Sequence, residues 1–193
     1  MNELVTNSDS GFKLKGEFWV KLGNNLSRAE VIENADRHIK NLIVDIASNQ
    51  LAEWAFTGTI ANVSEHVKGI MTLAVGTGAI GWDLQNPPAE SPSQEFLENE
   101  LTRKLFISKT YVDPVLLTPT LTRTNIIDFT TTFLETEAVG PLVEMGLFAG
   151  NHTQTGATDS TAPNGGTMIN AKNFPVINKP NTSQLTIVYR LTF

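Results

Sequence analysis

The first apolar segment of the chain, residues 12–22, is rich in β-forming residues and is bounded by Gly11 and Gly23. This pattern predicts a strand, and the Gly-Asn-Asn sequence that follows predicts a turn. The next four residues, Ser27 to Glu30, match a capping box, in which a serine hydroxyl and a glutamate carboxylate each bind a free N–H at the start of a helix. A helix is therefore expected to begin there.

Residues 32–56 fit two interpretations. Their apolar residues recur at intervals close to 3.6, which predicts one long helix ending near Phe56. In the second interpretation residues 38–44 form a buried strand, and Asp45 caps a shorter helix that stops at Gly58. The periodicity does not choose between them.

A continuous apolar run at residues 70–75 predicts a buried strand, and it leads directly into Gly76, Gly78 and Gly81. These glycines have the G-x-G-x-x-G spacing of a dinucleotide-binding turn, which requires a helix to begin inside the motif. The proline-rich sequence at 84–95 opposes such a helix. We therefore expect structural turn glycines with positive φ, and no bound nucleotide cofactor.

The second half of the chain differs from the first half in composition. Residues 96–103 permit one or two helical turns, but after Lys104 threonine becomes frequent and β-branched and aromatic residues cluster between Pro, Gly and Asn turns. Three such segments predict strands, at 104–112, 117–134 and 184–193. The expected fold is mainly β with a small α part: an antiparallel, jelly-roll-like β-sandwich preceded by an N-terminal strand and helix region.

The expected division places the N-terminal arm, strand and helix region at residues 1–60 and the sandwich body at 61–193, with one continuous domain as the alternative. The loops at 84–95 and 151–166, like the arm at residues 1–11, are polar and lack the apolar residues needed for a core. We expect the arm and at least one loop to contact other chains in an assembly.

The composition excludes several classes of functional site and of binding partner. The 193 residues carry a net charge of -6. The chain contains no cysteine, and this excludes disulfides, thiolate metal sites and a cysteine nucleophile. There is no basic surface for phosphates, and no apolar run of membrane-span or signal-peptide type. Neither nucleic acid nor a membrane is expected as a partner.

No constellation of catalytic or metal-binding residues stands out. His38, His66 and His152 lack metal-ligand spacing, and Asp159 has no spaced acidic partners for calcium. The paired acids, Glu98 with Glu100, Glu135 with Glu137, and Glu33 with Asp36, are best interpreted as solvated surface. We expect a non-enzyme with no catalytic residues, no metal and no cofactor.

Several short fragments occur in an order that resembles small virion proteins of tailed bacteriophages, of the tail, baseplate and fibre-attachment type. The matching fragments are Leu73–Gly78, Glu98–Lys104, Glu144–Phe148 and Phe174–Phe193. The sequence departs from the pattern in an insert around residues 33–38 and in the two long loops.

The resemblance implies a structural protein that docks on a tail, baseplate or neck ring and holds a fibre or a neighbouring subunit. Its partners would be further copies of itself, as a homo-oligomer, and other virion proteins. Its location would be the virion, assembled in the cytoplasm of a bacterial host.

Two alternatives stay open. One is a head or neck decoration protein, and the other is a carbohydrate-binding β-sandwich used in host recognition. The second needs an exposed aromatic side chain as a stacking platform. Trp19 and Trp54 lie in apolar patterns typical of a core, so Trp82 is the candidate glycan contact.

Overall fold

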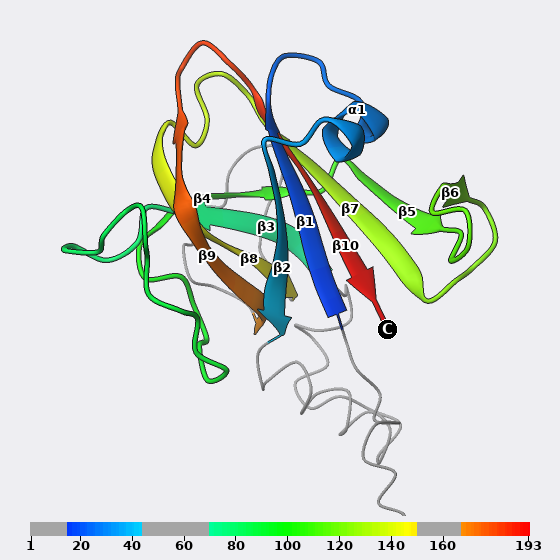
Figure 1. The fold of residues 1–193 in the computed structure, drawn as a ribbon, viewed down its shortest axis with the longest axis horizontal. Coiled ribbons are helices and arrows are strands. Elements are labelled where there is room, and N and C mark those ends of the chain that lie inside the picture. The colour runs from blue at the N-terminus through cyan, green and yellow to red at the C-terminus, as the bar shows by residue number, and fades with distance from the viewer. Residues whose placement is uncertain (1–14, 44–69, 150–166) are drawn as a thin grey trace, which may run out of the picture.

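The computed structural model describes residues 15–43, 70–149 and 167–193, and these form a mainly β, sandwich-like fold with one short helix (Figure 1). The predicted fold class is confirmed. The elements are β1 (Lys15–Leu22), α1 (Arg28–Glu33), β2 (Arg37–Ile43), β3 (Ile70–Gly76), β4 (Glu100–Leu105), β5 (Ser108–Val112), β6 (Pro119–Thr120), β7 (Ile126–Phe133), β8 (Gly140–Ala149), β9 (Thr167–Lys179) and β10 (Leu185–Thr192).

Two antiparallel sheets face each other. The first has the strand order β2-β1-β10-β7-β5-β6, and the second has the order β4-β3-β8-β9-β2. Strand β2 belongs to both, because residues 37–41 pair with β1 whereas Leu42 and Ile43 pair with β9. At the other side, the chain crosses between the sheets after β4, where the Ile107 N–H donates to the Thr130 carbonyl at 2.8 Å.

The core lies between the sheets and follows the two-residue alternation of the strands. In β10 the odd-numbered residues point inward, from Leu185 to Leu191, and in β7 Phe129 and Phe133 do the same. Phe18 of β1 contacts the rings of Phe174 and Tyr189 from the two sheets, at centroid distances of 6.1 and 6.5 Å. These aromatic contacts join β1, β9 and β10 across the sandwich.

The expected capping box is present at α1. The Ser27 hydroxyl accepts the Glu30 N–H, and the Glu30 carboxylate accepts the Ser27 N–H at 2.9 Å. The helix packs on the outer face of the first sheet, where Val31 contacts Trp19 and Val188. It ends after Glu33, so the prediction of one long helix to residue 56 is wrong.

Strand β2 occupies most of the strand expected at 38–44 in the second interpretation, but it is not the buried strand expected, because His38 and Lys40 are exposed. The helix expected after Asp45 lies outside the described residues, as do the arm and the loop at 151–166. Strands β1 and β2 lie between β10 and β9, so the described part of the N-terminal region is built into the sandwich.

Residues 96–103, whose sequence permits one or two helical turns, contain no helix: residues 96–99 form a bend and a turn, and β4 begins at Glu100. Pairing with β3 supplies the backbone hydrogen bonds of this strand, with Ala74 opposite Arg103. A sequence of mixed propensity takes its conformation from the strand beside it.

Candidate functional site

The carboxylate of Glu144, on β8, holds the turn that follows β3. It is fully buried and accepts backbone N–H groups from Gly78 at 3.0 Å, Glu98 at 2.9 Å and Asn99 at 2.8 Å. Three of the sequence fragments that carry the virion-protein resemblance therefore meet at one side chain. We call Glu144 and these three N–H groups the Glu144 anchor.

Burial raises the pKa of Glu144, against the three N–H groups that favour the carboxylate, and the nearby charge of Glu98 raises it further. A raised carboxyl pKa in a cleft can indicate a general acid. Here both oxygens accept backbone N–H groups of the chain's own turn and loop. The geometry fits a group that organises the backbone.

The three glycines lie at and after the end of β3, for different reasons. Gly76 is the last residue of the strand and lacks the expected positive φ; glycine is required there because a Cβ would lie 2.4 Å from Glu144 Oε1 and 2.5 Å from the Asn99 carbonyl. Gly78 has φ +70, and a Cβ on it would meet the Trp82 ring at 2.4 Å. Gly81 has φ +92 with open space around it, so glycine is required there only because of the backbone conformation.

This turn lacks the features of a nucleotide site. No helix follows β3 within the described residues 77–99, and the Gly78 N–H donates to Glu144. The pyrophosphate of a dinucleotide would need that donor and a helix N-terminus.

A cleft of 440 Å³ lies beside the Glu144 anchor, under the loop from residue 82 to residue 98. Its apolar lining consists of Trp82, Pro88, Ala89 and Phe96, and its polar lining consists of Ser91, Ser93, Gln94, Glu95, Glu98 and Asn173. We call it the Trp82 cleft. Trp82, the candidate glycan contact, therefore lines a concave surface, whereas Trp19 is buried under α1 and Trp54 lies outside the described residues.

The loop that forms the cleft is fastened to β9. The Asn173 N–H donates to Glu90 at 2.7 Å, its side-chain amide donates to the Pro88 carbonyl at 2.9 Å, and Lys172 pairs with Glu90 at 2.6 Å. Leu97 is fully buried in a small cluster with Phe148. The loop is thus better anchored than its polar sequence indicated.

A second exposed feature was missed by the sequence analysis: the hairpin of β5 and β6. Its connecting loop presents three consecutive aliphatic residues, Val115, Leu116 and Leu117, with Leu116 72% exposed. Asp113 holds this loop, because its carboxylate accepts the N–H groups of Val115 and Leu116, both at 2.8 Å. We call residues 113–121 the apolar hairpin tip.

Two further contacts show that the tip has a defined conformation. The Leu117 N–H donates to the Asp113 carbonyl at 2.9 Å, and the Asp113 N–H donates to the Thr118 carbonyl at 2.8 Å. Leu117 has φ +56, which is unusual for a residue other than glycine. The signal in the sequence was an aliphatic triplet between Pro114 and Pro119, which resembles the interior of a strand.

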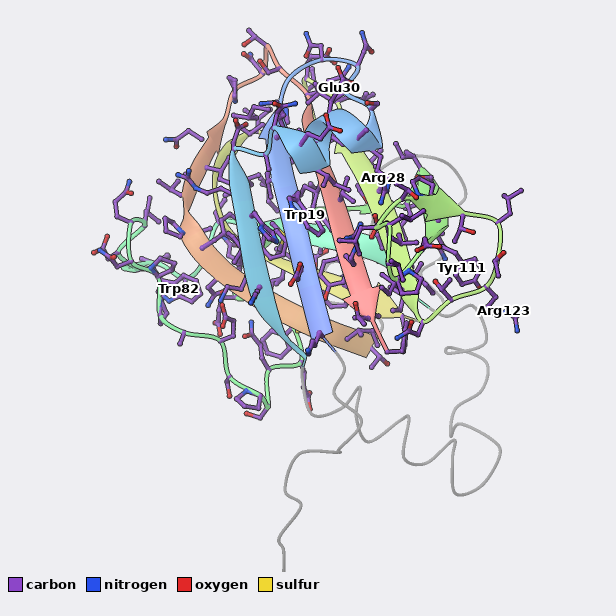
Figure 2. The ribbon with its side chains drawn as sticks, turned by 45° about the vertical axis from the view of Figure 1, so that its right-hand side comes forward. Trp19, Arg28, Glu30, Trp82, Tyr111 and Arg123 are labelled. Atoms are coloured by element: carbon purple, nitrogen blue, oxygen red, sulfur yellow. The ribbon has the colours of Figure 1, made fainter. Side chains whose placement is uncertain are left out.

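A buried ion cluster lies on the outer face of the first sheet, beside α1. Asp128 is fully buried and pairs with Arg190 Nε at 2.7 Å and with Arg28 Nε at 2.7 Å. The Arg190 guanidinium lies over the Trp19 ring, 5.0 Å from its centroid, and His38 stacks on the same ring at 4.6 Å. Figure 2 shows Trp19 and Arg28 near each other on this face. The cluster fixes α1 to the sheet.

Two of the paired acids expected to be solvated surface, Glu100 and Glu137, are instead largely buried in ion pairs, and a third, Asp36, has a backbone contact. Glu100 pairs with Arg103, Glu137 with Lys104, and Asp36 accepts the Leu22 N–H at 2.8 Å. Among the described residues, no group of three or more His, Asp or Glu side chains is arranged to hold a metal ion. His66, His152 and Asp159 lie outside them.

Comparison with protein-family models finds no match to this chain, and no curated protein matches it either. Within the part of the chain that the structure describes, no helix has the length and apolar character of a membrane span.

Proposed function

We propose that this protein is a non-enzymatic structural component of a tailed-phage virion, which docks on a tail, baseplate or neck ring and binds a neighbouring subunit. The observation that carries the proposal is the apolar hairpin tip. Several large aliphatic side chains held in solvent on a rigid loop mark an interaction site, because they have no use in a protein without a binding partner.

The tip has the properties of a docking element. Leu121 is fully exposed, and Leu116 and Leu117 are mostly exposed, so covering them with a partner removes apolar surface from water. Because Asp113 already fixes the loop, little conformational entropy is lost on binding. The Glu144 anchor adds support, since it joins three of the four fragments on which the resemblance to virion proteins rests.

The test is to locate the chain in the particle. Virions of the phage that encodes this protein are purified, their proteins are identified by mass spectrometry, and the particles are imaged by cryo-electron microscopy. We expect density for the sandwich on the tail, baseplate or neck, with the hairpin tip against another subunit. Absence of the chain from purified virions contradicts the proposal, and density on the capsid surface favours head decoration.

A further inference from the structure

We propose that copies of this chain associate head to tail, with the apolar hairpin tip of one copy seated in the Trp82 cleft of the next. This inference rests on the proposed structural function and names the partner that the tip contacts. The observations that carry it are complementary shape, an arginine beside the tip that is opposite in charge to the acidic cleft, and the placement of the two surfaces.

The two surfaces are complementary in shape and polarity. The tip is convex and aliphatic, whereas the cleft is concave and has an apolar wall of Trp82, Pro88 and Phe96. Three further large apolar residues close in sequence to the lining residues Trp82 and Glu98 are exposed, namely Ile80, Leu84 and Leu101. Burying Leu116 and Leu117 against this wall covers apolar surface on both copies at once.

The cleft is acidic, and a basic residue lies beside the hairpin tip; within the tip itself the only charged residue is Asp113, whose carboxylate accepts the N–H groups of Val115 and Leu116. Residues 82–99 contain four acidic residues, Asp83, Glu90, Glu95 and Glu98, and no Lys or Arg. Glu90 is paired with Lys172, while Glu95 and Glu98 are exposed at the cleft. The hairpin segment carries the exposed Arg123 two residues after Leu121. An apolar contact flanked by an Arg and two carboxylates gives a defined register.

The placement of the surfaces makes the association head to tail. Figure 1 shows the β5–β6 hairpin and the loop after β3 at opposite sides of the molecule, and Figure 2 places Arg123 and Trp82 in the same way. In a two-fold dimer the tip of each copy would have to enter the cleft of the other at the same time, which surfaces at opposite sides of the molecule cannot do. A heterologous contact of this kind closes into a ring or continues as a filament.

The test uses two variants that each lose one surface. Leu116→Asp places a charge within the apolar hairpin tip, and Phe96→Asp places a charge in the cleft. Leu134→Asp is the matched control, because Leu134 is an exposed leucine outside both surfaces. All three changes lie on exposed side chains, so circular dichroism and thermal melting should match the wild type.

Analytical ultracentrifugation measures the mass of each variant across a range of concentrations. We expect the wild type and Leu134→Asp to form oligomers and each surface variant to be a monomer. A mixture of the two surface variants should give a one-to-one dimer and nothing larger, because only one intact tip and one intact cleft remain to meet. A mixture that stays monomeric, or a wild type that is monomeric at every concentration, overturns the inference.

The natural chain has no cysteine, which allows a direct check of the contact. The variants Ser93→Cys and Leu117→Cys are mixed and oxidised. We expect a disulfide-linked heterodimer in preference to either homodimer, and a random mixture of the three species contradicts the proposed register. A charge exchange, Arg123→Glu with Glu95→Lys, should restore association that either change alone weakens; failure to restore it counts against Arg123 as the partner of Glu95.

One outcome would assign the cleft to a different occupant. If the wild type is monomeric and a glycan array shows binding that Trp82→Ala abolishes, then the cleft holds a saccharide and the head-to-tail contact is wrong. The proposed virion function fails separately, through absence of the chain from particles. A chain found in virions as isolated monomers would overturn this inference alone.

Discussion

The carboxylate of Glu144 accepts the N–H of Gly78 at 3.0 Å, across a separation of 66 residues in the sequence. The same side chain accepts two further N–H groups from the segment that precedes β4. One buried acid thus organises the turn after β3 and the end of the long loop, and the Trp82 cleft is built on that support.

Replacing Glu144 with Gln should lower the free energy of unfolding by about 1–3 kcal/mol. The side-chain NH2 of Gln, which replaces one carboxylate oxygen, cannot accept a hydrogen bond, so at least one buried N–H loses its acceptor. Urea unfolding of the two proteins measures the difference. Glu98→Gln is the control, because the Glu98 side chain is exposed and its loss should cost no more than about 0.5 kcal/mol. Equal stability of the two variants would contradict the anchor.

Gly76→Ala should lower the free energy of unfolding by about 1–3 kcal/mol, as expected for overpacking. The new Cβ would clash with both the Glu144 carboxylate and the Asn99 carbonyl. The Asn99 carbonyl belongs to the backbone, so it cannot move away by a change of rotamer. Gly81→Ala separates space from conformation, because the surroundings are open and only the positive φ opposes a side chain. We expect about 1 kcal/mol there, and a larger loss at Gly81 than at Gly76 would refute this assignment.

Asp128→Asn should destabilise the protein by about 3 kcal/mol, because two arginines would lose their shared buried counter-charge. Thermal unfolding gives the value. Removing the exposed ion pair of Lys21 and Asp36, 3.4 Å apart, by Lys21→Ala is the control and should change stability by less than about 1 kcal/mol. If both changes have the same small effect, the ion cluster does not hold α1 on the sheet.

The pKa of Asp113 is lowered by the N–H groups of Leu116 and Val115, which bind its carboxylate. A carboxyl pKa that is lower in the folded state contributes stability above the unfolded pKa, and this contribution is lost as the pH falls through the folded pKa. The amide resonances of Val115 and Leu116 should therefore titrate with a midpoint below the ordinary value of 3.8. A midpoint at or above that value would show that the carboxylate does not hold the tip.

Much of this fold is determined by the local sequence. The alternation in β7 and β10, the continuous apolar run of β3 and the capping box at Ser27 each determine their element through interactions between near neighbours. The positive φ of Gly78 and Gly81 was also predicted, whereas the requirement for glycine at Gly76 comes from the close approach of Glu144 and Asn99. The predicted features are local, so the sequence alone was sufficient to predict a mainly β fold.

The tertiary structure decided the rest, because distant segments supply the partners. Glu100 to Arg103 became a strand since β3 offered hydrogen-bonding groups along its edge. Glu144 and Asp128 are isolated acids in the sequence, and only folding brings them donors from 45 to 100 residues away. The triplet Val115 to Leu117 has the composition of a buried strand, yet no other described segment covers it. Which apolar residues are covered depends on the packing of the whole chain, and on the partners that it meets.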